Sequence, residues 1–312
     1  MTGFQPEMDP KAAERLLQAI LKEPISDLRP IEGGELSKAY SYRLRDREFV
    51  VRFNRNGEGF RKERYIFEHF APQGLPIPRM HEVGRAGELY YSIADKIPGK
   101  SLVTYPEDDV AKLVPEVVRV FTDMNRIRPA GTRGYGWIQP SGDGAYDDWV
   151  SFLTSFFQEE QTGFWEGWHE LFERSFLERD LFDRWYALMI DLARSAPEER
   201  YLVHGDFHFG NMLSDGSALT GVVDWEMAMY GDFVFDLATQ HLWTPHFRVP
   251  QTVRETWARE GVDIPRFEER LLCALLFKGL DGLRFYAKQG NKDAYDSAKR
   301  QIAGFIRDAQ AD

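Results

Sequence analysis

Three oxygen-bearing side chains, Asp206, Asn211 and Asp224, form the strongest candidate site in the sequence. Asn211 follows Asp206 by five residues, and Asp224 follows Asn211 by thirteen. Two short apolar runs, Met212–Leu213 and Leu219–Val223, flank a turn and predict a hairpin that brings the three side chains to one end. Carboxylate and amide oxygens are hard ligands that suit Mg²⁺ on phosphate oxygens. The spacing therefore predicts chemistry on a phosphate.

The same spacing is typical of protein-kinase-like phosphotransferases, in which a loop Asp, a following Asn and an Asp after a hairpin act together. A single Asp beside a glycine is ordinarily a turn or cap residue, but three residues in this context favour catalysis. A metal-dependent hydrolase is an alternative, because His204, Asp206 and His208 read His-x-Asp-x-His. A nucleotide-binding scaffold without catalysis is a third possibility.

The elements that must position these residues differ between the two ends of the chain. Near the start, Asp9 and Pro10 predict a helix N-terminus. Alternating runs predict strands over 39–44, 48–53 and 88–97, and residues 61–70 have a helical pattern. Further on, helical patterns cover 110–124 (with Pro115 kinking or splitting it), 146–161, 177–194, 233–242, 253–260, 267–288 and 292–309.

Charge follows the same division. The chain of 312 residues has a net charge of -11 and a pI near 5.3. Residues 1–100 contain 17 basic and 15 acidic residues, for a net charge of +2, whereas the remainder has a net charge of -13. This acidity argues against nucleic acid as a partner and favours a cationic small molecule.

The remaining composition narrows the class of protein. No 18-residue apolar stretch and no signal peptide are present, so we expect a cytoplasmic protein that does not span a membrane. The single cysteine, Cys273, excludes a disulfide scaffold and lies on an apolar helical face, where we expect a core thiol. We expect a monomer.

Several segments resemble the aminoglycoside phosphotransferase and choline-kinase-like family. The signature is His204-Gly-Asp-Phe-His-Phe-Gly-Asn211 followed by Val222-Val-Asp-Trp-Glu226. Further segments are similar to the hygromycin B phosphotransferases of that family: Glu32-Gly-Gly-Glu, Phe60-Arg-Lys-Glu-Arg-Tyr, Leu75-Pro-Ile-Pro and Asp224 to Asp232. The resemblance implies an α+β, two-lobed protein-kinase-like fold. A small antiparallel-sheet lobe with a helix (1–96) would bind nucleotide, and a larger, mainly helical lobe (97–312) would hold the catalytic and acceptor sites.

The resemblance also implies a role for each residue of the signature. Asp206 would orient the acceptor hydroxyl and take its proton, while Asn211 and Asp224 would hold Mg²⁺ on the phosphates of ATP, with GTP as an alternative donor. His204 would support the loop from behind. Catalysis would come from positioning and charge neutralisation.

On the nucleotide side, the family places a phosphate-binding loop at Gly33, Gly34 and Ser37. A lysine is expected on the third strand, but this chain has Arg52 there, for which Glu63 is the expected partner. Lys62 and Glu68 are the rival cation and acid. Adenine would lie against the connector from Ala94 to Ile97.

The acceptor implied by the resemblance is a cationic aminoglycoside of the hygromycin B type, which would make the protein an antibiotic-resistance kinase. Carboxylates and aromatic faces would bind it. The candidates nearest the motif are Glu226, Asp232 and Trp243, and an acidic insert adds Asp147, Asp148, Glu159, Glu160, Glu166 and Glu170 among Trp149, Trp165 and Trp168. The alternative to acceptor binding is that these acids lie on solvated helix faces and that the Trp residues pack in the core. For Asp236 we expect a cap on the following helix. Other acceptors to consider are choline, homoserine, methylthioribose and a macrolide.

Overall fold

The computed structural model describes residues 6–32, 37–194 and 196–311. The chain divides into two compact units, each with its own core. The first comprises Met1–Asp123, Pro140–Gly142 and Phe209–Ala228, and the second Met124–Gln139, Asp143–His208 and Met229–Asp312. The lobe boundary expected at residue 96 stays a prediction. In the part of the chain that is described, no helix has the length and apolar character to cross a membrane.

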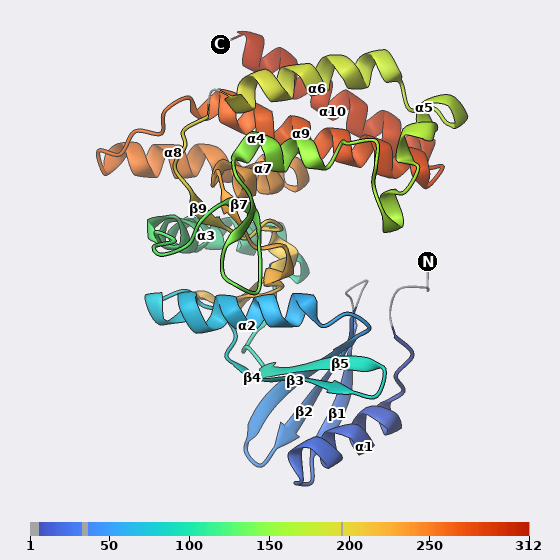
Figure 1. The fold of residues 1–312 in the computed structure, drawn as a ribbon. Helices are drawn as coiled ribbons and strands as arrows, with labels where there is room; N and C mark the ends of the chain where they lie inside the picture. Colours follow the sequence, from blue (N-terminus) through green and yellow to red (C-terminus); the bar gives the residue numbers. More distant parts are fainter. Residues whose placement is uncertain (1–5, 33–36, 195, 312) are drawn as a thin grey trace. The chain divides into compact units, whose positions relative to one another are not determined.

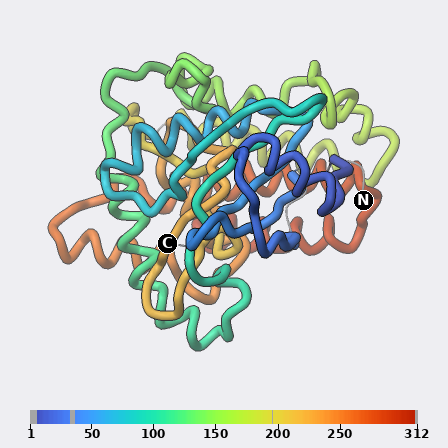
Figure 2. The backbone as a smooth tube through the Cα atoms, turned by 90° about the horizontal axis from the view of Figure 1, so that it is seen from below, coloured from blue at the N-terminus to red at the C-terminus, as the bar shows by residue number. Residues whose placement is uncertain are grey.

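The first unit contains a five-stranded antiparallel sheet, which confirms the antiparallel sheet predicted near the start of the chain. Its strands are β1 (Ser26–Ile31), β2 (Lys38–Leu44), β3 (Arg47–Asn54), β4 (Met80–Ala86) and β5 (Leu89–Asp95), in the order β1-β2-β3-β5-β4. Helix α1 (Pro10–Leu21) begins as expected, because the Asp9 carboxylate accepts a hydrogen bond from the Ala12 N–H at 2.8 Å. It crosses one face of the sheet, where Ala13 and Leu17 are fully buried (Figures 1 and 2).

Buried and partly exposed side chains alternate along β3, so successive residues lie on opposite faces of the sheet. Phe49, Val51 and Phe53 are buried in the core under α1, so the intervening Arg52 points to the opposite face. Helix α2 (Glu58–Phe70), followed by the 3-10 turn η1 (Ala71–Gln73), covers that face (Figure 1). The sheet therefore presents Arg52 toward α2.

The predicted hairpin is confirmed and belongs to the first unit. Strands β10 (Met212–Ser214) and β11 (Leu219–Val222) pair antiparallel, with Met212 opposite Val222. A third short strand, β6 (Lys100–Ser101), pairs with β10. Short 3-10 turns lie beside these strands: η2 (Leu102–Thr104), η5 (Phe209–Asn211) and η6 (Trp225–Met227).

The second unit combines a small sheet with most of the helices, which confirms the predicted α+β class. Its strands β7 (Tyr135–Ile138), β8 (Gly144–Tyr146), β9 (Tyr201–Val203) and β12 (Met229–Gly231) have the order β8-β7-β12-β9. Its helices are α4 (Trp149–Ser155), α5 (Leu171–Arg174), α6 (Arg179–Arg194), α7 (Val234–Trp243), α8 (Val249–Arg259), α9 (Phe267–Lys288) and α10 (Lys292–Ala311), with 3-10 turns η3 (Gly163–Trp165), η4 (Trp168–Glu170) and η7 (Pro245–Phe247).

Helix α9 is the centre of the second unit. It packs against α6, α7 and α10 and is buried along most of its length (Figure 1). Its mostly apolar run from Leu271 to Leu283 explains this position, since a helix that is apolar around most of its circumference must be covered on most sides.

Two predicted helices differ in extent from the observed ones. Helix α3 (Glu107–Arg126) continues through Pro115, so of the two expected effects of this proline the split does not occur, and the kink stays a prediction. The helix expected over 146–161 ends at Ser155. Beyond this point the backbone carbonyls accept hydrogen bonds from side chains instead of from helical N–H groups: Gln161 donates to the Ser155 carbonyl, and Arg284 donates to the Phe156 carbonyl.

Arg284 of α9 explains how the segment after α4 is held. Its side chain is fully buried, and it donates to Asp281 at 2.6 and 2.9 Å. The guanidinium carbon lies 3.8 Å from the centre of the Trp165 ring and 5.2 Å from that of Trp168. A buried cation is tolerated here because hydrogen bonds and aromatic faces replace its water.

We therefore expect Arg284→Met to lower the free energy of unfolding by about 2–4 kcal/mol, because it leaves the Phe156 carbonyl and Asp281 without this donor. Urea denaturation followed by fluorescence measures the change. The control is Arg174→Met, which removes an exposed ion pair with Glu170 and is expected to cost less than about 1 kcal/mol. Equal costs in the two variants would contradict the role of Arg284.

Candidate active site

The loop that follows β9 carries Asp206 within the second unit. His204 is fully buried, and its Nδ1 accepts a hydrogen bond from the Asp206 backbone N–H at 3.3 Å. The Asp206 side chain is 40% exposed, and its Oδ2 lies 3.3 Å from Nε2 of His208. The loop therefore presents a partly exposed carboxylate beside the His208 imidazole.

Asp206 stays ionised at neutral pH. Burial alone would raise the pKa of its carboxyl, but the hydrogen bond and charge of His208, with the charges of Lys278 and His204, outweigh burial and lower this pKa. An ionised carboxylate can accept a hydrogen bond and then a proton, as a general base must.

Asp236 fixes the backbone of this loop from inside α7. Its fully buried carboxylate accepts hydrogen bonds from the N–H groups of His204 at 2.8 Å and Gly205 at 2.9 Å. The prediction that Asp236 caps the following helix is wrong: it lies inside the first turn of α7, and its oxygens turn to the loop because these two amides need acceptors there. Burial raises the pKa of Asp236 to about 7, against the lowering effect of the two N–H groups and Lys278.

The hairpin brings Asn211 and Asp224 together in the first unit. The Val223 N–H donates to the Asn211 carbonyl at 2.9 Å, directly before Asp224. Asp224 has a left-handed backbone, with φ 65° and ψ 59°, which is costly for a residue with a Cβ. The buried Trp225 holds the turn, since its indole N–H donates to the Val222 carbonyl at 2.9 Å.

The donor set at this end of the hairpin suits Mg²⁺. The ion usually binds through one or two carboxylates together with substrate phosphates, so an amide oxygen and a carboxylate are sufficient protein ligands. By contrast, no three His, Cys, Asp or Glu side chains form a metal-binding group among the residues described. His204, Asp206 and His208 therefore do not form the cluster that the hydrolase alternative requires.

Arg52 and Glu63 are brought together between β3 and α2. The guanidinium donates through both terminal nitrogens to both carboxylate oxygens of Glu63, with one bond of 3.0 Å. The Glu63 side chain is 7% exposed, so the pair is largely shielded from water. Arg52 also interacts electrostatically with Asp224 and Glu226, which places its charge near the predicted metal ligand.

Lys62 and Glu68, the alternative cation and acid that the sequence offers for this pair, have other contacts. Lys62 donates to the Glu226 backbone carbonyl at 2.8 Å, and Glu68 pairs with Arg64 one turn before it at 2.8 Å. The Glu226 carboxyl packs against Gly59, where an added Cβ would lie 2.6 Å from it. Lys62 and Gly59 thus anchor the N-terminal half of α2 to the segment after Asp224.

The remaining nucleotide-side predictions lie around the sheet. Gly33 and Gly34 lie outside the described residues, whereas the hydroxyl of Ser37 accepts a hydrogen bond from the Asn54 amide at 3.1 Å. Ala94 lies within β5, between Val50 and Met80 on the neighbouring strands. Ile97 packs against Gly221 of β11.

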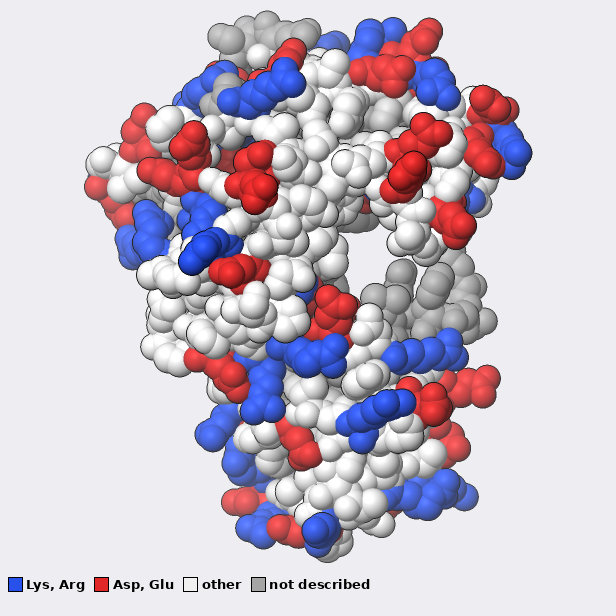
Figure 3. All heavy atoms as spheres, in the orientation of Figure 1, with Lys and Arg blue, Asp and Glu red and all other residues white. Residues whose placement is uncertain are grey.

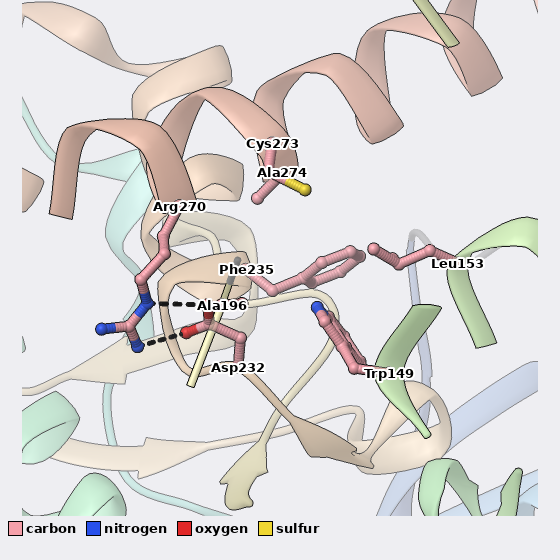
Figure 4. A pocket seen from close by; sticks show the side chains of 8 residues that line it. All are labelled: Trp149, Leu153, Ala196, Asp232, Phe235, Arg270, Cys273 and Ala274. Atoms are coloured by element: carbon pink, nitrogen blue, oxygen red, sulfur yellow. Dashed lines mark hydrogen bonds and ion pairs between the residues drawn. The ribbon is translucent and has the colours of Figure 1, made fainter. Parts of the chain in front are cut away.

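Of the predicted acceptor residues in the second unit, Asp232 has a structural partner and Trp243 is open. Arg270 donates to both carboxylate oxygens of Asp232, at 2.7 and 2.9 Å (Figure 4). Asp232 also accepts from the Val234 N–H at 3.0 Å at the start of α7. Trp243, at the end of α7, is 63% exposed.

The small cavity beside this ion pair is lined by core residues (Figure 4), among them Trp149, Phe235 and Cys273. Cys273 is the buried core thiol that the sequence predicts, and burial raises its pKa further above the usual range. This cavity is therefore part of the packing of the unit and contains no reactive thiolate.

The aromatic insert serves mainly as packing. Trp149 and Trp168 are buried, in agreement with the core alternative. Several of its acids have local partners: Asp148 caps α4, Glu159 lies 3.1 Å from His169 and Glu170 pairs with Arg174. Basic and acidic side chains also alternate over the face of the first unit, in the lower part of Figure 3.

Sequence reasoning missed one charged residue near the loop. Lys278 of α9 interacts electrostatically with Asp206 and Asp236, and its Nζ lies 3.5 Å from the Gly205 carbonyl oxygen. The only signal in the sequence is a lone lysine within the apolar run from Leu271 to Leu283.

Comparison with known proteins agrees with this geometry. A model of the phosphotransferase enzyme family, APH, matches residues 27–275. A hygromycin-B 4-O-kinase from Escherichia coli is 29% identical over 304 residues, which cover 97% of this chain and 87% of that protein.

Solved structures show the same fold. A thermostable mutant of aminoglycoside phosphotransferase APH(4)-Ia, in a ternary complex with AMP-PNP and hygromycin B, aligns with a TM-score of 0.79 at 28% identity, covering 95% of this chain and 98% of that one. Spectinomycin phosphotransferase APH(9)-Ia, with ADP and spectinomycin, has a TM-score of 0.66 at 12% identity over 98% and 99% of the two chains. The predicted kinase-like fold is confirmed.

We expect Arg52→Met to lower the free energy of unfolding by about 2–4 kcal/mol, because it leaves the buried Glu63 carboxylate without its cation. The double variant Arg52→Met/Glu63→Met should be less destabilised than the sum of the single variants. Urea denaturation of the four proteins measures the coupling. The matched control is the exposed Arg64–Glu68 pair of the same helix, for which a coupling below about 0.5 kcal/mol is expected.

Asp236 should make stability depend on pH. Since its folded-state pKa is raised, the folded protein retains this proton where the unfolded chain loses it, so stability decreases as pH rises from about 4 to about 7. Relative to Asp236→Asn, the wild type should therefore lose at least about 1 kcal/mol across this range, the equivalent of one pKa unit. Chemical denaturation at several pH values measures it.

Asp148→Asn is the control of opposite sign. The pKa of Asp148 is lowered by the backbone and side-chain hydrogen bonds from Ser151, so its contribution is present above the ordinary aspartate pKa and is lost in acid. Parallel stability curves for the wild type and Asp236→Asn would contradict the raised pKa of Asp236.

Proposed function

Since this chain belongs to the phosphotransferase enzyme family, we propose that it transfers the γ-phosphate of ATP to a hydroxyl of a cationic aminoglycoside of the hygromycin B type. The observation that carries the proposal is the hairpin end, where Asn211 and Asp224 adjoin through the bond from the Val223 N–H. Asp206 precedes this hairpin by a few residues and is ionised.

The first unit supplies the groups for the nucleotide. Arg52 provides a fixed cation for the α- and β-phosphates. Glu63 occupies the edge formed by its two terminal nitrogens, so the edge that carries the Nε–H is the one that would donate to phosphate oxygens. Ser37 belongs to the predicted phosphate loop with Gly33 and Gly34. For adenine, the Asp95 and Lys96 N–H groups already donate to the Arg79 and Glu48 carbonyls, so within the predicted connector we assign the base edge to the backbone of Ile97.

Asn211 and Asp224 would hold Mg²⁺, which supplies neutralisation of the phosphate charge when bound. The left-handed backbone of Asp224 supports this assignment, since strained residues persist where the surroundings fix them and cluster at functional sites. Trp225 and the Lys62 bond to Glu226 supply that fixation.

Asp206 would act on the acceptor. Its carboxylate accepts a hydrogen bond from the acceptor hydroxyl and orients that oxygen toward the γ-phosphorus. As the new oxygen–phosphorus bond forms and the bond to the β-phosphate oxygen breaks, the hydroxyl proton passes to Asp206 and the electron pair remains with ADP. Positioning and charge neutralisation carry this reaction, because its transition state is loose.

The choice of acceptor is supported by charge and by the relatives. Residues 101–312 have a net charge of -13, which suits a polycationic acceptor, and the aligned relatives act on or bind hygromycin B. Glu226 and Trp243 are the predicted contacts that remain proposals for the acceptor. The monomeric state, the cytoplasmic location and the use of GTP remain predictions from the sequence.

We expect purified protein with ATP and Mg²⁺ to phosphorylate hygromycin B, measured as ADP release and as a product heavier by one phosphate. The same assay should include choline, homoserine, methylthioribose, a macrolide and other aminoglycosides. Transfer to one of these acceptors but not to hygromycin B would contradict the proposed substrate and leave the reaction class intact. No transfer to any acceptor would contradict the proposal as a whole.

Asp206→Ala is the variant that tests the catalytic assignment. We expect it to lower kcat by about 10²- to 10⁴-fold, because general-base catalysis and hydroxyl orientation are lost. Nucleotide affinity, measured by calorimetry, should stay near the wild-type value, since the first unit supplies those contacts. Retained turnover would contradict the role of Asp206.

A further inference from the structure

Lys278 places a positive charge inside the second unit, at the loop before Asp206. It is the one charged side chain in the apolar run from Leu271 to Leu280 of α9. Its Nζ lies 3.5 Å from the Gly205 carbonyl oxygen and 4.1 Å from the centre of the Phe235 ring. A carbonyl dipole and an aromatic face are the groups that stabilise an ammonium where water is scarce.

Both the N–H and the carbonyl of Gly205 therefore have a side-chain partner. Asp236 of α7 accepts its N–H at 2.9 Å, while Lys278 of α9 approaches its carbonyl. Gly205 has φ +86°, a conformation in which a Cβ would be strained, so the chain turns here by virtue of glycine. The two helices therefore fix successive peptide groups: α7 holds the His204–Gly205 peptide through its N–H, and α9 approaches the Gly205–Asp206 peptide through its carbonyl.

The charges around Lys278 come from three elements. The loop contributes Asp206, with His204 and His208 beside it. Helix α7 contributes Asp236, and helix α9 contributes Asp281. A single ammonium among these carboxylates offsets their mutual repulsion and favours an ionised Asp206. Its loss would therefore change both the position and the charge balance of the loop.

We propose that Lys278 is a positioning residue of the transfer reaction, which fixes the Gly205–Asp206 peptide through the Gly205 carbonyl and keeps the Asp206 carboxylate in place for the acceptor hydroxyl. This inference rests on the proposed function. Because a displacement of about 1 Å at a reacting group can cost about 100-fold in rate, a modest shift of the loop is sufficient for a large effect on kcat.

The protonation state of Lys278 gives the proposal a distinctive signature. Burial lowers the pKa of Lys278 to about 8, against the raising effect of Asp236, Asp206 and Asp281. The ammonium is therefore lost in mildly alkaline solution, and the Gly205 carbonyl then has a weaker donor. A loss of activity centred near pH 8 follows for the wild type.

The test compares Lys278→Met and Lys278→Arg with a matched variant of the same helix. Lys288 also donates to a carbonyl, that of Glu166 at 3.4 Å, and lies 5.1 Å from the Phe164 ring, so Lys288→Met removes the same chemistry away from the loop. Steady-state kinetics use the best acceptor of the wild type, saturating ATP and Mg²⁺, from pH 6 to pH 10, with thermal unfolding of each variant.

We expect Lys278→Met to lower kcat about 10- to 100-fold with the KM for ATP changed less than about twofold, whereas Lys288→Met stays within about twofold in both. Equal kcat values for the two methionine variants would overturn the proposal. If Lys278→Met does not fold, the pH profiles decide, since Arg does not titrate in this range.

In the wild type we expect an alkaline decrease in kcat with an apparent pKa about 8, and in Lys278→Arg the decrease should disappear or move above pH 9. A wild-type profile that is flat to pH 9.5, or the same alkaline decrease in both proteins, would overturn the role of Lys278. A wild type without transfer to any acceptor contradicts the proposed function instead, so the two failures are distinguishable.

Discussion

A buried carboxylate needs hydrogen-bond donors, and in the second unit the donors available to Asp236 are the backbone amides of His204 and Gly205. This constraint joins α7 to the loop that carries Asp206, because neither partner can leave without exposing an unsatisfied polar group. His204 then accepts from the Asp206 N–H, and Lys278 lies at the Gly205 carbonyl. The loop is thus fixed through its main chain, which leaves the Asp206 side chain partly exposed for a ligand.

In the first unit, charged side chains rather than a buried carboxylate on backbone amides connect the elements. There, the paired charges of Arg52 and Glu63 connect β3 with α2, and Lys62 connects α2 with the segment after Asp224 through the Glu226 carbonyl. Each of these contacts crosses from one element to the next, so α2 determines how the strand cation and the carboxylates around the hairpin lie relative to one another. A rigid arrangement of this kind suits a reaction in which charges must be in place before the phosphoryl group moves.

Local patterns predicted much of this arrangement. The strands β2 and β3, the limits of α9 and the β10–β11 hairpin follow from alternation, helical period and turn residues, and the Arg52–Glu63 pair follows from the resemblance. The end of α4 and the role of Asp236 could not be predicted in this way, because they depend on hydrogen bonds from residues far along the chain, such as Arg284 to Phe156. Lys278 was missed for the same reason: its partners in the loop and in α7 are 42 or more residues away in sequence.

The guanidinium at position 52 has a consequence for chemical probes. Nucleotide analogues that carry an amine-directed electrophile label an enzyme by reaction with a neutral lysine amine beside the phosphates. Arg52 remains protonated at every usable pH and its nitrogens are delocalised, so it offers no such nucleophile. The nearby Lys62 donates to the Glu226 carbonyl within a largely buried environment. A reagent of this kind therefore finds no reactive amine at position 52 of this protein.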